Sequence, residues 1–219
     1  MVKLVSIQVG QPQWYEHPGR EDGDGSPELW QTAFYKEPVA GAVACYETGL
    51  AGDGVADHKN HGGPDKAVLG YSVDHYGYWC DLMGIPEMPC GAFGENLSLT
   101  GQTEAEVCIG DVWRLGAIEL QVSQPRQPCF KLGRRWNRPQ LPKEVIREGK
   151  SGWYFRVLRT GSIEAGNSLE LIDRPHPEWT VQRASQTLYA RPFERAACAE
   201  LASLPELSLS WREQLHRQS

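Results

Sequence analysis

The most regular pattern in the chain is an alternation of apolar and polar positions near its middle. Residues 118–123 alternate strictly, and a Gly-Ala turn joins them to the segment VWRL at 112–115. A period of two predicts a β-hairpin with one buried face. The hairpin leads into a loop in which Pro125 and Pro128 argue against the continuation of a central strand. Further short strands are expected at 3–9, 39–46, 152–158 and 168–172.

Helical periodicity replaces this alternation in two places. In segment 72–83 apolar residues recur every three to four positions, so we expect a helix with Ser72 as its N-cap and Gly84 at its end. Pro175 and Pro177 mark a boundary, beyond which no strand pattern remains. Three short helices are expected there, at 180–189, 193–203 and 205–217.

We therefore expect a mainly β, barrel-like domain over residues 1–175 and a small three-helix domain over residues 176–219. Segment 11–38 is polar and rich in proline and glycine, which is typical of a long surface excursion. Segment 144–149 is expected to form a helical turn.

Composition narrows the function classes. The chain has 219 residues and a formal net charge of -6, which argues against general nucleic-acid binding. No apolar run reaches the roughly 18 residues needed to span a bilayer, and the N-terminus does not resemble a signal peptide. The six cysteines form no CxxC pair, so neither a structural zinc site nor a redox dithiol is indicated. Free thiols and a cytoplasmic location are the simplest interpretation.

The segment SQPRQPC at 123–129 is the first candidate for chemistry. A cysteine thiolate is a soft ligand for a soft metal centre, and Arg126 lies three residues before Cys129, where its charge would stabilise the thiolate. The same guanidinium could instead bind a phosphate. The residues alone leave open that Cys129 is a buried cysteine without a chemical role.

Two glycine-containing segments are further candidates. HGGPDK at 61–66 could form a backbone nest for an anion, with Lys66 beside it, or only a tight loop. GAFGENL at 91–97 places Glu95 and Asn96 between glycines and a strand, which suits polar recognition of a ligand and equally suits a turn.

These segments occur in an order that closely resembles the YiiM-type branch of the MOSC family. The matching motifs are HGGPDKAV (61–68), GAFGENLS (91–98), IGDVWRLG (109–116), VSQPRQPCFKL (122–132) and GWYFRVL (152–158). The tail from about residue 176 is similar to the three-helix extension of that branch. Segment 11–38 matches least, and the tail is short. The resemblance implies a mixed β-barrel domain that holds a pyranopterin molybdenum cofactor.

The resemblance also implies roles for individual residues. Cys129, at the end of the motif, would supply the protein thiolate to molybdenum. The phosphate and pterin edges of the cofactor need cationic and amide donors. We expect these from Arg126, Lys66, Asn96, Ser123 and Gln124 and from the amides of 123–127.

The implied reaction is the two-electron reduction of N-hydroxylated substrates, such as 6-hydroxylaminopurine, to the corresponding amines, in a detoxifying role. His61 and Glu95 are candidates for the proton donor. No flavin, haem or iron–sulfur motif is visible, so the resemblance implies a separate electron-donating reductase. A homodimer is left open.

Two alternatives remain. One is a sulfur carrier or transfer protein that uses a persulfide on Cys129 and holds no molybdenum. The other is a carrier that binds the molybdenum cofactor without catalysis. The reductase interpretation follows the resemblance most closely.

Overall fold

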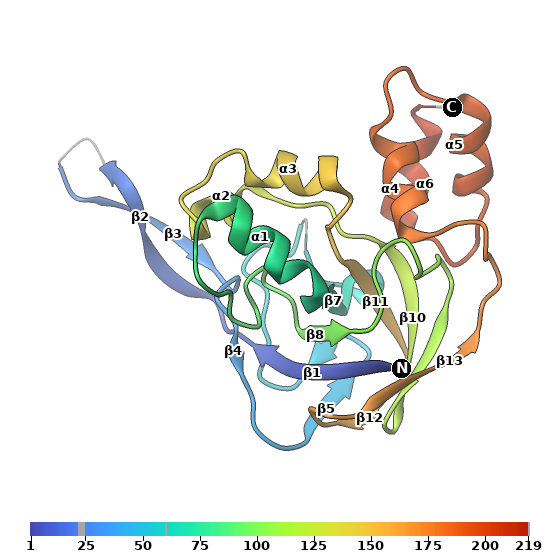
Figure 1. Ribbon diagram of the computed structural model, residues 1–219, viewed down its shortest axis with the longest axis horizontal. Coiled ribbons are helices and arrows are strands. Elements are labelled where there is room, and N and C mark those ends of the chain that lie inside the picture. The colour runs from blue at the N-terminus through green and yellow to red at the C-terminus, as the bar shows by residue number, and fades with distance from the viewer. Residues whose placement is uncertain (22–24, 60, 219) are drawn as a thin grey trace.

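Seven strands close into a barrel in the computed structural model, which describes residues 1–21, 25–59 and 61–218 (Figure 1). Around the barrel they run β13 (Ser168–Asp173), β9 (Val112–Leu115), β10 (Ile118–Pro125), β11 (Trp153–Arg159), β7 (Val68–Ser72), β8 (Leu97–Thr100) and β1 (Val2–Val9). Antiparallel pairing of β1 with β13 closes the ring. Only the β7–β8 pair is parallel among these strands, so the barrel is mixed as expected.

The predicted hairpin is confirmed as β9 and β10. Ile118 pairs with Leu115, and the apolar residues of the alternation point into the core. The expectation that the strand stops before the prolines was wrong, because β10 continues to Pro125, which lies opposite Trp153. The register shifts between Val122 and Gln124, so the proline occupies the last strand position, beyond an irregularity.

Smaller strands surround the barrel. The strand expected at 39–46 is shorter, β5 (Val43–Tyr46), and it forms a three-stranded sheet with β6 (Gly49–Leu50) and β12 (Gly161–Ile163). The excursion predicted over 11–38 is an ordered hairpin of β2 (Gln13–Glu21) and β3 (Pro27–Thr32) that projects from the barrel (Figure 1). Residues 22–24 of it lie outside the described residues, and β4 (Glu37–Pro38) then pairs with β1.

The expected helix at 72–83 begins later than predicted. A 3-10 turn, η2 (Val73–His75), precedes α1 (Tyr76–Met83). Ser72 is the last residue of β7 and makes no side-chain capping bond, so its predicted role was wrong. Gly84 ends α1 with a φ of 67°. Two further short helices, α2 (Phe130–Arg135) and α3 (Leu141–Glu148), and the 3-10 turn η1 (Pro64–Lys66) complete the barrel region.

The three C-terminal helices are present as predicted: α4 (Val181–Tyr189), α5 (Arg195–Ala202) and α6 (Leu209–His216). Thr180 caps α4 by accepting the amide of Arg183 at 3.0 Å. Their buried faces join the barrel in one continuous hydrophobic cluster, in which Trp179 and Trp211 are fully buried. In the described part of the chain, no helix has the length and apolar character needed to cross a lipid bilayer.

Candidate functional site

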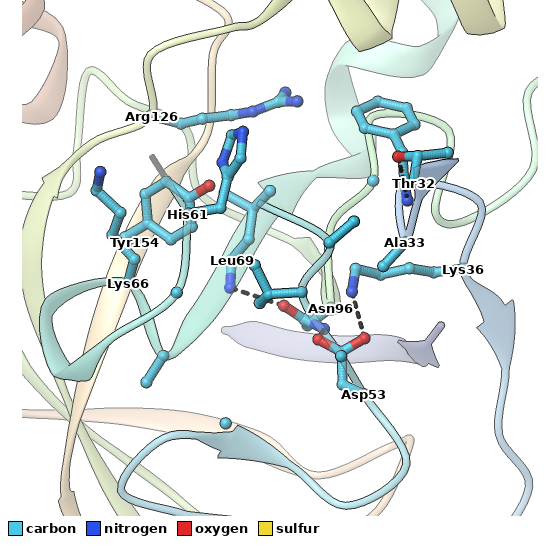
Figure 2. Close-up of a pocket in the computed structure, with 18 of the residues that line it drawn as sticks. Thr32, Ala33, Lys36, Asp53, His61, Lys66, Leu69, Asn96, Arg126 and Tyr154 are labelled. Atoms are coloured by element: carbon cyan, nitrogen blue, oxygen red, sulfur yellow. Dashed lines mark hydrogen bonds and ion pairs between the residues drawn. The ribbon is translucent and has the colours of Figure 1, made fainter. Parts of the chain in front are cut away.

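One cavity of about 820 Å³, counting the space at its open mouth, brings together most of the candidate segments. It lies where the base of the β2–β3 hairpin meets loops from the barrel (Figure 2). Its lining residues come from the segments 32–36, 48–56, 61–69, 94–96 and 126–131, and from Tyr154.

Cys129 lines this cavity at the end of the loop that follows β10, immediately before α2. All six cysteines lie in the described part of the chain and are free, and Cys129 is the one among the lining residues. Its neighbour in the loop, Arg126, is only 4% exposed, and its amide donates to the carbonyl of Gly152 at 3.0 Å. Figure 2 shows the Arg126 side chain extended along one side of the cavity.

Positive charge dominates the cavity. Lys36, Lys66, Arg126 and Lys131 line it, whereas Asp53 is the one carboxylate among the described lining residues. Burial lowers the pKa of Lys36, which the nearby Asp53 opposes, and burial likewise lowers the pKa of Lys66. Cations that lose hydration without enough counter-charge are stabilised by an anion. The cavity is therefore suited to an anionic ligand.

Asn96 and Asp53 organise the floor of the cavity. The Asn96 side-chain amide donates to Asp53 Oδ2 at 2.8 Å, and its oxygen accepts the amide of Leu69 at 3.1 Å. Asp53 also accepts the amide of Gly10 at 2.9 Å and forms an ion pair with Lys36 (Figure 2). Because Asn96 is held on both sides, it fixes the carboxylate that in turn positions the lysine.

His61 projects into the cavity near Arg126 (Figure 2). Two left-handed glycines, Gly62 and Gly63 with φ of 76° and 84°, turn the chain after it toward η1 and Lys66. Burial and the charge of Lys131 lower the pKa of His61 to about 4. The imidazole is therefore neutral at pH 7 in the absence of a ligand.

Comparison with known proteins assigns the chain. Residues 57–170 match the MOSC domain, and residues 179–218 match the YiiM-like, 3-alpha helix domain. The chain belongs to the MOSC family. It is 40% identical over 209 residues to the "Uncharacterized protein YflK" of Bacillus subtilis, a match that covers 95% of this chain and 90% of that protein.

Two other relatives extend this assignment to the whole MOSC fold. The crystal structure of YiiM from Geobacillus stearothermophilus matches with a TM-score of 0.82 and 37% identity, over 100% of this chain and 99% of that one. A protein of Gibberella moniliformis named "Reductase" is 41% identical over 181 residues, which cover 81% of this chain but only 32% of that protein. The mixed barrel and its helical extension are therefore those of the YiiM-type MOSC proteins.

Five of the site residues expected from the sequence meet at the cavity of this MOSC protein: Cys129, Arg126, Lys66, Asn96 and His61. Glu95 is not among the lining residues, and its side chain is fully buried. Its carboxylate accepts the amides of Gly91 at 2.8 Å and Phe93 at 2.9 Å, the hydroxyl of Ser98 at 3.0 Å, and the hydroxyl of Tyr76. Glu95 thus holds the 91–95 loop from behind.

Ser123 and Gln124 also lie behind the cavity wall. The Ser123 hydroxyl lies 2.5 Å from the carbonyl oxygen of Asp65 and 3.1 Å from that of Tyr154. It therefore joins the Cys129 loop (residues 123–129, the end of β10 and the residues after it) to the His61 loop (residues 61–66). Gln124 is 1% exposed, and its amide nitrogen contacts the carbonyl of Pro125 at 3.2 Å. Both residues support the lining without forming part of it.

Sequence reasoning missed several lining residues. Lys36, Asp53 and Phe34 come from segments without a recognised motif, although the glycine-rich stretch before Asp53 indicated a tight loop. Phe34 reaches the cavity because the Thr32 hydroxyl accepts its amide at 3.0 Å. Its ring then packs so closely on Gly94 that a Cβ there would lie 2.8 Å from the ring. Lys131, Tyr154 and the side chain of Gln127, of which only the backbone amide was expected, complete the set that was not foreseen.

Proposed function

We propose that this chain is a molybdenum-cofactor-dependent reductase that converts N-hydroxylated substrates, such as 6-hydroxylaminopurine, to amines. The observation that carries the proposal is that Cys129 lines the same cationic cavity of a MOSC domain as Arg126, whose Nη1 has no hydrogen-bond partner among the described residues. The similarity to a fungal protein named "Reductase" supports the redox class.

The cavity residues fit the cofactor. Arg126 Nη1 is buried and has no hydrogen-bond partner within the described residues, which is costly unless a ligand accepts from it. A guanidinium matches the oxygens of a phosphate such as the cofactor carries. The described residues contain no group of three or more His, Cys, Asp or Glu side chains able to hold a metal ion. A metal bound through Cys129 must therefore bring most of its ligands with it, as a cofactor-bound metal does.

Four of the lining residues would bind the cofactor. Cys129 would hold the metal, and Arg126, Lys66 and Asn96 would hold the polar edges and phosphate of the cofactor. When bound, the cofactor supplies the two-electron redox chemistry. The net reaction consumes two electrons and two protons, breaks the N–O bond, and releases an amine and water.

Proton delivery falls to His61 in this proposal. Its ring lies in the cavity, whereas the Glu95 carboxylate is outside the lining and accepts from the loop behind the cavity and from Tyr76 and Ser98. An anion bound beside the ring favours its protonated form and so opposes the lowering of its pKa by burial. His61 could then hold a proton at a ring nitrogen within the cavity.

The electrons would come from a separate reductase that docks near the cavity mouth. The chain spans only 32% of the fungal "Reductase", so two thirds of that protein lie outside the match. We propose that here a second polypeptide has the electron-donating role, and a homodimer of this chain stays a prediction.

The test measures molybdenum per chain and turnover of 6-hydroxylaminopurine with a chemical electron donor, in protein from cells that make ample cofactor. Wild type is compared with Cys129→Ala and with Cys80→Ala, which removes a thiol outside the cavity. We expect metal and turnover in wild type and Cys80→Ala, and loss of both in Cys129→Ala.

Two outcomes would point elsewhere. Metal without turnover in wild type favours the non-catalytic cofactor carrier. Absence of molybdenum and turnover in wild type overturns the proposal, and a sulfane sulfur on Cys129 would then favour the sulfur carrier.

A further inference from the structure

The C-terminal helices contact the Cys129 loop directly at three points. The amide of Ser208 donates to the carbonyl of Ser123 at 2.9 Å, and the Ser210 hydroxyl lies 3.4 Å from Gln124 Oε1. Further along the loop, Gln127 Nε2 donates to Gln214 Oε1 at 3.1 Å and to the hydroxyl of Tyr189 at 3.4 Å. These contacts come from α4, from α6 and from the residue that precedes α6.

The start of α6 also contacts the His61 loop, which carries Lys66. The amide of Leu209 donates to Asp65 Oδ2 at 3.2 Å, and Arg156 donates from Nε to Asp65 Oδ1 at 2.9 Å. The Arg156 guanidinium in turn reaches the carbonyl of Glu206 at 3.4 Å. Asp65 directly precedes Lys66, which lines the cavity. The start of α6 therefore touches both loops that carry the candidate site.

The start of the Cys129 loop is attached to the barrel, because Gln124 and Pro125 pair with Tyr154 and Trp153 of β11. Pro125 and Pro128 have no amide hydrogen, and the amide of Arg126 is bonded to Gly152, outside the loop. Gln127 is the loop residue whose side-chain amide is held by two different helices. Both of its N–H hydrogens are accounted for by these contacts, so the side chain acts as an anchor between the loop and the helices.

We propose that the three-helix unit positions the Cys129 loop, with Gln214 and Tyr189 as positioning residues that act through Gln127. The identity of Cys129 as a metal ligand rests on the proposed function, but the positioning itself does not. The loop is held in one conformation before any ligand binds, which reduces the ordering that binding would otherwise require.

The experiment uses full-length protein prepared without molybdenum and measures the alkylation rate of Cys129 by iodoacetamide. Gln214→Leu removes the acceptor for Gln127, whereas Gln214→Glu keeps an acceptor oxygen there, on a carboxylate in place of the amide. Glu213→Leu places the same new side chain at an exposed neighbour on α6. Cys45, which is 1% exposed, reports general unfolding in the same samples.

We expect Gln214→Leu to label Cys129 about five-fold faster than wild type, the change expected for one lost hydrogen bond. Gln214→Glu and Glu213→Leu should label at the wild-type rate, and Cys45 should stay unlabelled throughout. With cofactor supplied, Gln214→Leu should also retain less molybdenum per chain than wild type.

The proposed function and the positioning role fail separately. Faster labelling in Gln214→Leu alongside a wild type that takes up no molybdenum would sink the reductase and leave the positioning role intact. Equal labelling of Cys129 in Gln214→Leu and wild type overturns the positioning role, whatever the molybdenum content. Faster labelling of Cys45 in Gln214→Leu also overturns it, because the residue would then support the whole fold.

Discussion

At the scale of single residues, the cavity contains a buried donor and an excess of positive charge, both of which favour the binding of an anion. Arg126 is 4% exposed, and its Nη1 has no hydrogen-bond partner among the described residues, while His61 lies in a cavity that three lysines also line. A buried donor without an acceptor reduces the stability of the ligand-free protein. A bound anion would accept from Arg126 and offset the positive charge, so the same cavity that destabilises the ligand-free protein favours anion binding.

The lowered pKa of His61 predicts how the free energy of unfolding depends on pH. Its pKa is lowered to about 4 in the folded protein, whereas a histidine in the unfolded chain titrates near 6.5. Between these values the unfolded chain binds more protons, so the free energy of unfolding falls as pH falls from about 6.5 to about 4. Solvent screening limits the contribution of this partly buried group to about 1–2 kcal/mol.

Urea unfolding of the ligand-free protein at about pH 7 and about pH 4.5 measures that loss. We expect His61→Asn to lose less stability than wild type between the two pH values, by about 1 kcal/mol. His58→Asn, which changes a histidine outside the cavity lining, is the control and should behave as wild type. An equal loss in His61→Asn and wild type would show that His61 titrates normally.

At the scale of elements, the end of the β2–β3 hairpin and the residues that follow it, 32–36, line one side of the cavity. Trp30 on its inner face is 6% exposed, and the Arg134 guanidinium of α2 lies 5.0 Å from that ring and 3.1 Å from Glu28. The outer face is open, with Trp14 65% exposed. The hairpin is thus fixed against α2, and it delivers Phe34 to the cavity from outside the segment that matches the MOSC domain.

We therefore expect Phe34 to contribute to the recognition of an aromatic substrate. Phe34→Leu should raise the KM for 6-hydroxylaminopurine about three- to ten-fold and leave kcat nearly unchanged, because ring contacts act equally in the ground and transition states. Trp14→Leu makes the matched change on the outer face and should alter neither constant. Steady-state kinetics on both variants measures these constants. A fall in kcat with a constant KM for Phe34→Leu would contradict a role of Phe34 in substrate recognition.

The elements that the sequence predicted well are those with one buried face. The alternation at 118–123 and the cap at Thr180 both indicate local structure directly. The hairpin at 13–32 was missed because its segment is polar and rich in proline and glycine, and because its inner face is buried by α2, which is distant in the sequence. Helix α2 was missed because it has only six residues and includes a glycine.

At the scale of the whole molecule, contacts between distant residues determine the site. Val2 pairs with Leu169 to close the barrel, and Asp53 binds both Lys36 and Asn96, which come from two other segments. Periodicity describes one segment at a time, so it could predict neither contact. The resemblance to MOSC proteins indicated the barrel and Cys129, but the residues outside its motifs emerged only from the structure.

The same long-range packing bears on whether residues 176–219 form an independent domain. Trp179 and Trp211 of the helical unit belong to the hydrophobic cluster that also contains Leu4 and Phe155 of the barrel. The helices also hold the loops at 61–66 and 123–129. A unit that shares its core and its polar contacts with the barrel should not unfold alone.

We therefore expect calorimetry of the ligand-free protein to show one transition. Trp211→Ala removes a fully buried side chain from α6 and should destabilise the whole protein by about 3–5 kcal/mol, lowering Tm by roughly 10 °C. Leu209→Ala changes a residue on the same helix that is 57% exposed and should leave Tm within about 2 °C of wild type. Two transitions, of which Trp211→Ala moves only one, would show that the helices fold apart from the barrel. A single transition, shifted to a lower temperature in Trp211→Ala, would mean that α6 and the cavity unfold together. This is expected because the start of α6 contacts both the Cys129 loop and the His61 loop.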